Sequence, residues 1–196
     1  MVVKKVRIAV KSFAAGSTGD VAPLTDLIID NDDLGGNGRM ALGAIDAAGN
    51  IYAPGDNGMS VYAPGSNGFA TPTTVFTNNG DVDFSSPIAL DSQGDIYAAA
   101  GAAKLDFFTP ANIANSTPAR ALEGAATRLA GSTGLAVDAS GNLYVVGYAT
   151  PSNSYSLKVY RAGSIGNVAP KFVDAVPNTS ITFPEIFLAV SPPATP

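Results

Sequence analysis

An eight-residue segment occurs three times in this chain at nearly constant spacing. The copies begin at Ile45, Leu90 and Val137 and read IDAAGNIY, LDSQGDIY and VDASGNLY. Their aspartates, at positions 46, 91 and 138, are 45 and 47 residues apart. A period between roughly 20 and 50 residues is typical of solenoids, propellers and other arrays of one repeated unit. The chain is therefore expected to fold as such an array.

Composition narrows the chemistry that this array can perform. The 196 residues include no cysteine and no histidine. Disulfides, thiolate metal sites, cysteine nucleophiles and the Ser-His-Asp arrangement are therefore excluded. A catalytic carboxylate, lysine or tyrosine, or a metal bound by oxygen atoms, stays open. The length and the repeat favour one domain spanning residues 1–196.

Charge and hydropathy exclude two further classes of protein. The 11 basic and 16 acidic residues give a net charge of −5, with no basic run. Nucleic-acid binding needs a basic stripe, so we expect no nucleic-acid partner. No stretch approaches the ~20 apolar residues of a membrane span. Low charge, many small polar residues and the lack of cysteine indicate a bacterial protein that is extracellular or on the cell surface.

A second motif alternates with the first. It is clearest as FAAGSTGDVAP at residues 13–23 and YRAGSIGNVAP at residues 160–170, with looser copies at 62–72 and 108–118. In the last repeat the motifs separate four short apolar, β-branched or aromatic runs, at 134–138, 142–149, 157–161 and 171–176. The runs show no helical periodicity and are bounded by Gly, Pro, Asn and Asp. They predict four β-strands per unit.

The first two predicted strands of each unit are joined by a tight turn with the pattern Asp-x-x-Gly-Asn or Asp-x-x-Gly-Asp. Aspartate can fold its carboxylate onto nearby backbone amides, and glycine can adopt a positive φ. At Asp138, Gly141 and Asn142 the same residue types could also suggest a calcium loop. Because two predicted strands flank the segment directly, we interpret it as a structural turn.

Four antiparallel strands in about 45–50 residues is the size of a propeller blade. The pattern AVDASGNLYV at 136–145, with VYRAGS at 159–164 and GNVAP at 166–170, resembles NHL-repeat-like β-propellers of bacterial secreted proteins. More distantly, it is similar to the gluconolactonase and virginiamycin B lyase group of propellers. The resemblance covers about residues 6 to 190 and implies an all-β propeller. The lyase comparison also implies a catalytic histidine, which this chain lacks.

The two ends of the chain indicate how the propeller is completed. Residues 6–13 and 24–29 match the third and fourth strands of a blade, and residues 185–191 match a first strand. We therefore predict about four four-stranded blades, with the C-terminal strand completing the N-terminal blade. That strand could come from the same chain or from a neighbouring subunit, so a closed monomer, an arc closed by a second copy and a fibre all stay open. The units are expected at 6–41, 42–86, 87–132 and 133–182, with the closing strand at 183–192.

Up-and-down strands place the repeated turns on one face of the propeller and the connections that differ between units on the other. Propellers usually bind ligands through variable loops on a rigid scaffold, so we expect the binding site on the second face. Its candidate ligand-binding residues are acidic apart from one tyrosine: Asp30, Asp32, Asp33, Asp56, Asp81, Asp83 and Tyr148.

Two kinds of ligand fit these residues. Asp30, Asp32 and Asp33 offer the oxygen atoms that Ca²⁺ prefers, but the twelfth position counted from Asp30 is Ala41 rather than the glutamate of an EF-hand. We interpret these acids as a solvated loop and expect no cofactor, with Ca²⁺ as the alternative. Tyr148 could stack on a sugar or anchor its own loop. The expected partner is a protein or a carbohydrate.

Three functional hypotheses follow. The leading one is a non-enzymatic secreted or surface propeller that acts as a binding, interaction or structural module. The first alternative is a metal-dependent lactonase or hydrolase, in which Glu185 lies at the central channel without a repeated set of partners. The second alternative is a self-assembling filament subunit joined by exchange of terminal strands.

Overall fold

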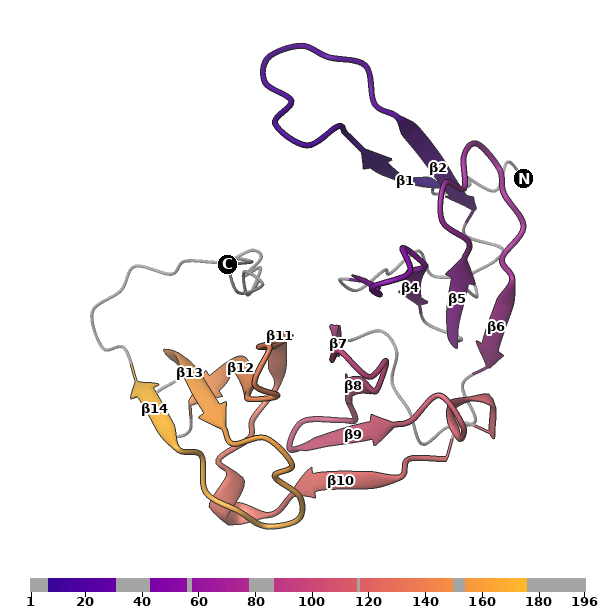
Figure 1. Cartoon of the computed structure of the whole chain (residues 1–196). Coiled ribbons are helices and arrows are strands. Elements are labelled where there is room, and N and C mark those ends of the chain that lie inside the picture. Colours follow the sequence, from indigo (N-terminus) through magenta and orange to yellow (C-terminus); the bar gives the residue numbers. More distant parts are fainter. Residues whose placement is uncertain are drawn as a thin grey trace, which may run out of the picture.

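The computed structural model describes residues 7–30, 43–55, 58–77, 87–115, 117–149 and 154–175. Within them the chain is all-β, with one two-stranded and three four-stranded antiparallel sheets and two short 3₁₀ helices. The sheets are arranged around a common centre like the blades of a propeller (Figure 1). The predicted all-β class is confirmed. No helix of the described part is long and apolar enough to cross a membrane.

The four sheets follow one another along the chain and are numbered here in that order. Sheet 1 contains β1 (Arg7–Ser12) and β2 (Thr25–Asp30). Sheet 2 contains β3 (Ala44–Ile45), β4 (Ile51–Gly55), β5 (Gly58–Tyr62) and β6 (Thr74–Thr77). Sheet 3 contains β7 (Ile88–Leu90), β8 (Ile96–Ala99), β9 (Lys104–Phe108) and β10 (Arg120–Glu123). Sheet 4 contains β11 (Ser132–Val137), β12 (Leu143–Ala149), β13 (Ser154–Tyr160) and β14 (Phe172–Ala175).

Each four-stranded sheet is an up-and-down meander, so neighbours in sequence are neighbours in the sheet. The first strands lie toward the centre, where β7 contacts both β3 and β11 (Figure 1). The four strands predicted for the last repeat are confirmed as β11 to β14, although β13 begins at Ser154 instead of Leu157. Sheet 1 agrees with the two strands predicted near the N-terminus.

The core lies between the sheets rather than inside any one of them. Leu105 and Leu122 of sheet 3 share one buried cluster with Val145 and Tyr160 of sheet 4. Two further clusters join sheet 2 to sheet 3 and sheet 1 to sheet 2. Because inner sheets are covered on both faces, their strands lack a polar face, and all four residues of β8 are buried. We call each such interface a seam and name it by its two sheets.

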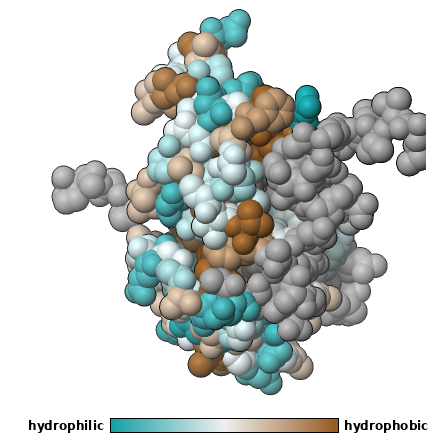
Figure 2. All heavy atoms as spheres, turned by 90° about the vertical axis from the view of Figure 1, so that its right-hand side faces the viewer, coloured by the Kyte–Doolittle hydropathy of each residue, from teal (hydrophilic) through white to brown (hydrophobic). Residues whose placement is uncertain are grey.

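Where the described residues form the outer surface on the side that bears β6, they make no extended apolar face. Figure 2 shows this side, where apolar side chains form separate spots among hydrophilic ones on the part not drawn in grey. Val75 of β6, 54% exposed, is one residue of this kind. Single exposed apolar side chains are normal on soluble proteins.

Candidate functional site

The repeated aspartate forms a closed hydrogen-bonded turn. The Asp138 carboxylate accepts hydrogen bonds from the backbone amides of Ser140 and Asn142 at 2.9 and 2.8 Å. It also accepts one from the Asn142 side-chain amide at 2.8 Å and one from the Tyr144 hydroxyl at 3.1 Å. Gly141 adopts the left-handed conformation that this turn requires, with φ 79°. The structural-turn interpretation is confirmed for this repeat.

Asp46 makes the same set of contacts in the first copy. It accepts from the amides of Ala48 and Asn50, from the Asn50 side chain at 2.7 Å and from the Tyr52 hydroxyl at 3.3 Å. Burial would raise the pKa of Asp46, but these hydrogen bonds outweigh it and lower the pKa. For Asp138, the hydrogen bond from Asn142 is the main cause of a lowered pKa. Both carboxylates are therefore held in the charged form.

The second copy differs at one position, where Asp95 replaces the asparagine. Asp91 still accepts from the Asp95 amide and from the Tyr97 hydroxyl, both at 3.0 Å. The Asp95 carboxylate pairs instead with the guanidinium of Arg120 at 3.1 Å. Burial and the charge of Asp91 raise the pKa of Asp95, and Arg120 opposes them. Arg120 also lies over the ring of Phe107, 5.5 Å from its centre.

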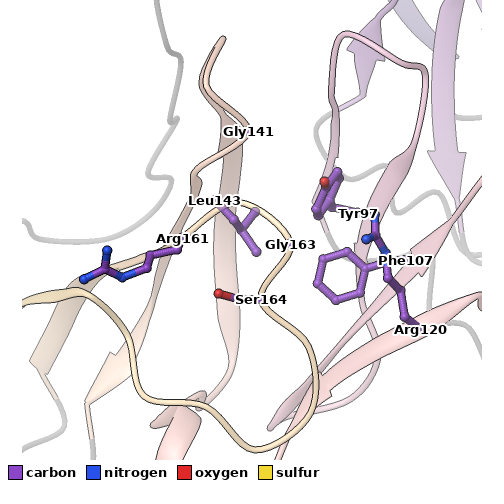
Figure 3. Close-up of a pocket in the computed structure, with 8 residues that line it drawn as sticks. All are labelled: Tyr97, Phe107, Arg120, Gly141, Leu143, Arg161, Gly163 and Ser164. Atoms are coloured by element: carbon purple, nitrogen blue, oxygen red, sulfur yellow. The ribbon is translucent and has the colours of Figure 1, made fainter.

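This ion pair borders a small pocket in the seam between sheets 3 and 4. Figure 3 shows the pocket, where Tyr97, Phe107 and Arg120 of sheet 3 face the β11–β12 and β13–β14 turns of sheet 4. Tyr97 and Phe107 meet edge to face, with ring centres 4.8 Å apart. Sheet 4 contributes Gly141, Leu143, Arg161, Gly163 and Ser164. The pocket volume is about 10 Å³, which is room for one water molecule.

A much larger pocket occupies the corresponding place in the seam between sheets 2 and 3. Its volume is about 260 Å³. The lining residues carry no formal charge: Asn50, Tyr52, Val61, Thr73, Thr74, Phe76, Gly94, Ile96, Pro110 and Ile113. The wall is of mixed polarity: apolar side chains make one part of it, and Asn50 and the two threonines are among the groups that add polar atoms. We call this pocket the open groove.

A backbone contact that we call the clip closes the seam between sheets 3 and 4. The N–H of Gly166 donates to the carbonyl of Ala121 at 2.7 Å, and the N–H of Glu123 donates to the carbonyl of Gly166 at 3.2 Å. Gly166 thereby pairs in parallel with Leu122 of β10, whose side chain is fully buried. The clip therefore joins the last turn of one sheet to the outer strand of the preceding sheet.

A second clip closes the seam between sheets 1 and 2. The N–H of Gly68 donates to Asp26 and the N–H of Ile28 donates to Gly68, both at 2.8 Å. Gly68 pairs with the fully buried Leu27, as Gly166 pairs with Leu122. Asn67 adds its side-chain oxygen, which accepts from the Asp26 amide at 2.7 Å. Two of the three described seams are thus closed in the same way.

The seam between sheets 2 and 3 lacks this contact. The turn that would supply it, in the third repeat, contains a 3₁₀ helix, η2 (Ile113–Asn115), in place of the Gly-Ser-x-Gly sequence. Across the described ranges, no backbone hydrogen bond joins this turn to β6. The open groove lies at this seam, between Thr74 of β6 and Ile113 of the turn.

The predicted binding face lies mostly outside the described residues. This applies to Asp32, Asp33, Asp56, Asp81 and Asp83, and also to Glu185 and the closing strand 183–192. Asp30 is the last residue of β2, where its backbone pairs with Arg7. The face therefore stays a prediction.

Tyr148 lies within β12, near the end of the strand predicted at 142–149, so it stands at the edge of the connection rather than in it. In the β12–β13 hairpin it pairs opposite Tyr155. Their ring centres are 4.8 Å apart with a tilt of 31°. Tyr148 is 38% exposed. The ring contact gives it an anchoring role in this hairpin. Its ligand-binding role stays a prediction.

Sequence reasoning missed the residues that distinguish the seams. Asp95 was visible as the single exchange of asparagine for aspartate among the three octapeptides. Arg120, its partner, carries no motif. The departure of residues 108–118 from the Gly-Ser-x-Gly pattern was also visible, and it marks the seam without a clip.

A serine and a lysine of β13 form a buried pair that resembles a catalytic arrangement. The Lys158 ammonium donates to the Ser156 hydroxyl at 2.6 Å and to the carbonyl of Tyr148 at 3.3 Å. Burial lowers the pKa of Lys158. Serine–lysine pairs serve as nucleophile and base in some hydrolases. Here both side chains are only 2% exposed and cannot meet a substrate, so we assign the pair a structural role. The described ranges also contain no group of three acidic residues that could hold a metal ion.

No protein-family model and no curated protein matches this chain. Among solved structures, a chain described as the crystal structure of the eukaryotic initiation factor is similar to it, with a TM-score of 0.43 and 12% identity. The similarity covers 78% of this chain and 36% of that one, so this chain spans about a third of its length. A likeness at this level carries no functional argument.

Proposed function

We propose that this chain is a non-enzymatic binding module, secreted or on the cell surface, that takes up an apolar side chain of a protein partner in the open groove. The observation that carries the proposal is the 260 Å³ pocket at the seam without a clip. The equivalent pocket at the seam between sheets 3 and 4 has about 10 Å³. A packed interior rarely leaves such a volume unused, and concave apolar pockets with a few polar groups are where proteins bind ligands.

The chemistry of the groove supports a protein partner. Val61, Phe76, Ile96, Pro110 and Ile113 make an apolar wall, and the lining bears no charge. The volume lies below the ~300–1,000 Å³ of sites for drug-sized molecules, and fits one side chain with its flanking backbone. The Thr73 hydroxyl already donates to the carbonyl of Val61 at 3.0 Å and can still accept a hydrogen bond from that backbone, and Thr74 adds a second hydroxyl.

The titratable groups near the seams support a binding role rather than catalysis. Asp46 and Asp138 are engaged by four hydrogen bonds each, and their pKa values are lowered, which disfavours them as proton donors. Asp95, with a raised pKa, is held by Arg120. These carboxylates therefore stabilise the fold, and the open groove is the part that we propose binds a partner.

We also propose that the propeller has four blades, with residues 183–192 supplying the first strand of the N-terminal blade. The register supports this, because β1 and β2 correspond to the third and fourth strands of the other sheets. In the described residues β1 pairs on one side alone, with β2. Sheet edges of this kind are normally covered. The completing strand can belong to the same chain or to a neighbouring subunit.

Nuclear magnetic resonance with designed peptides tests the binding proposal. The probes are short Gly/Ser peptides with a single central Leu, Ile, Phe or Trp. Binding in the open groove shifts the methyl signals of Ile96 and Ile113 as peptide is added. A peptide with a central alanine is the matched probe and is expected to give shifts at least tenfold smaller at equal concentration.

Two tryptophan variants on β6 locate the binding. Thr74→Trp places an indole at the groove, because Thr74 lines it. Val75→Trp, one residue away, is the control, since Val75 does not line the groove and is 54% exposed. Peptide shifts are expected to disappear in the first variant and persist in the second. If oligosaccharides shift these signals and peptides do not, the partner is a carbohydrate and not a protein. If neither probe shifts them, the open groove is not a binding site.

A further inference from the structure

The turn between β1 and β2 has the sequence of a clip. Residues 62–68 and 160–166 contain Gly-Ser-x-Gly and form clips, whereas the turn of the third repeat lacks this sequence and forms none. Residues 13–19 read FAAGSTG and contain the same pattern. At every described seam, a turn with the Gly-Ser-x-Gly sequence forms a clip and the turn without it forms none. The N-terminal turn has this sequence and is therefore expected to form a clip.

The backbone of this turn already has the clip conformation. Gly16 and Gly19 have φ values of 80° and 73°, compared with 72° and 67° for Gly163 and Gly166. The Ser17 hydroxyl donates to Ala14 at 2.7 Å, as the Ser66 hydroxyl donates to its own turn at 2.8 Å. Within the described ranges no backbone hydrogen bond reaches Gly19. The turn is therefore formed, and among the described residues it has no outer strand to clip.

The face of sheet 1 beside this turn is exposed where the other sheets are buried. Tyr62, Phe108 and Tyr160 end the third strands of sheets 2, 3 and 4, and each is 0% exposed beneath the preceding sheet. Phe13 occupies their position in sheet 1 and is 48% exposed. Lys11 lies on the same face, where its ammonium pairs with Asp26 of β2 at 2.5 Å and 46% of its side chain is exposed. Sheet 1 thus presents the surface that a preceding sheet covers elsewhere.

Sheet 4 presents the complementary surface at the other end of the arc. Asp174 of β14 pairs with Leu157, in the register in which Leu122 pairs with Leu105 and Leu27 pairs with Val10. Asp174 therefore occupies the position that a clip glycine contacts at the two closed seams. No backbone hydrogen bond from another sheet reaches β14 in the part of the chain that the structure describes. On the same strand, Phe172 is 52% exposed.

We propose that these two surfaces form a fourth seam between two copies of this chain, with Gly19 of one copy clipping β14 of the next. Figure 1 shows β14 and the β1–β2 turn well apart at the two ends of the arc, so they do not contact each other within the described part of the chain. In the fourth seam Gly19 bonds the carbonyl of Val173 and the N–H of Ala175, which correspond to the Ala121 and Glu123 groups in the observed clip.

The side chains match in charge and hydropathy. By the geometry of the existing seams, the Phe172–Asp174 face of β14 packs on the face of sheet 1 that carries Phe13 and Lys11. The apolar rings then share one buried surface, and the Asp174 carboxylate lies on the side of the Lys11 ammonium. The contact is head to tail, since it uses different surfaces on the two copies. Such an interface closes into a ring or continues as a fibre.

Two variants, one for each surface, test the proposal by sedimentation of the full chain over a range of concentrations. Ala175→Pro removes the outward N–H of an edge strand, a position where proline is tolerated. Phe13→Asp places a charge on the exposed face of sheet 1. The unmodified chain is expected to form multiples of its 19.7 kDa mass as concentration rises. Each variant alone is expected to stay at 19.7 kDa.

Matched controls separate the seam from general damage. Thr77→Pro makes the Ala175 change at the corresponding place on β6, which bears no clip. Ile165→Asp charges another residue that is 52% exposed. Both controls are expected to assemble like the unmodified chain. Circular dichroism establishes that each variant is folded. An unfolded variant is replaced by Phe13→Glu on sheet 1 or Phe172→Lys on β14, each of which places a charge on an exposed ring of the proposed seam.

Mixing the two variants gives the decisive result. A head-to-tail seam uses β14 of one copy and sheet 1 of the other, so Phe13→Asp and Ala175→Pro chains should form a pair of about twice 19.7 kDa and stop there. A monomeric unmodified chain at all concentrations, unchanged assembly of either variant, or no pairing on mixing would overturn the proposal. The open groove is untouched in both variants, so peptide binding and assembly can fail independently.

Discussion

The seams on the two sides of sheet 3 differ in how they are closed. Toward sheet 4, Gly166 clips β10 and the remaining pocket has about 10 Å³. Toward sheet 2, a 3₁₀ turn replaces the glycine sequence, and the open groove has about 260 Å³. The strands on both sides keep the same order and pairing. The difference teaches that a turn of about seven residues determines whether a seam is sealed or available to a ligand.

The largest expected effect comes from removing the side chain beneath a clip. Leu122 is 0% exposed and belongs to the cluster that joins sheets 3 and 4. Leu122→Ala should lower the free energy of unfolding by about 2–5 kcal/mol, measured by urea denaturation. Val75→Ala, on the outer strand of the open seam, should change it by less than about 0.5 kcal/mol. Equal effects would mean that the clipped seam is not the tighter one.

A buried hydroxyl at the closed seam should give the next largest effect. The Tyr160 hydroxyl donates to the carbonyl of Thr127 at 2.6 Å, and neither residue is exposed. Tyr160→Phe leaves that carbonyl buried without its donor, which should cost about 1–3 kcal/mol in thermal or urea unfolding. Tyr144→Phe is the control and should cost less, because its partner Asp138 is half-exposed and can bond water. If Tyr160→Phe is as stable as the unmodified chain, water reaches the carbonyl of Thr127 and the seam between sheets 3 and 4 is not sealed.

Grafting a clip onto the open seam should convert one kind of seam into the other. The substitutions Ala111→Gly, Asn112→Ser and Ala114→Gly give the third repeat the Gly-Ser-x-Gly sequence. Two new backbone hydrogen bonds, each worth about 0.5–1.5 kcal/mol, are offset in part by the flexibility of two added glycines, so a gain of about 1 kcal/mol is expected. Peptide binding is the more sensitive measurement: the peptide probes should no longer shift the methyl signals of residues that line the open groove. Retained peptide binding would show that the missing clip does not create the groove.

The smallest effect concerns pH at the closed seam. Lys158 lies on the face of β13 that carries Tyr160, and burial lowers its pKa. The folded chain therefore binds fewer protons than the unfolded chain at pH values just below the ordinary lysine pKa of about 10.4. The stability of the unmodified chain relative to Lys158→Met should rise as pH increases toward that value, and urea unfolding at pH 7 and pH 10 measures it. A difference that stays constant between these pH values would contradict a buried, water-excluded Lys158.

The parts of the fold that were predictable are those encoded within a few residues. The Asp138 turn contains its acceptor, its donors and its glycine within seven positions, so the hairpin could be read directly from the octapeptide. The alternation of apolar runs and turns gave the strands in the same way. The predicted strand 142–149 ends where β12 ends, but the start of β13 at Ser154 instead of Leu157 was missed, because the length of a hairpin depends on pairing, which no local signal reports.

The seams were not predictable, because their contacts join residues that only the packed sheets bring together. Arg120 and Asp95 are 25 residues apart, and Arg120 belongs to no motif. The contrast between sealed and open seams was present in the sequence as the lost Gly-Ser-x-Gly pattern. Its meaning required knowing that this turn reaches across to the preceding sheet.

The closed turns and the clips also imply an order of events during folding. All bonds of the Asp138 turn join residues at most six positions apart, so the turn can form on its own in microseconds. The backbone hydrogen bonds of the clips join residues 40 to 45 positions apart and depend on two finished sheets. Each hairpin is then expected to be native-like in the folding transition state, and the seams to form afterwards. Unfolding would begin where the molecule is assembled last, by separation of whole sheets along their seams.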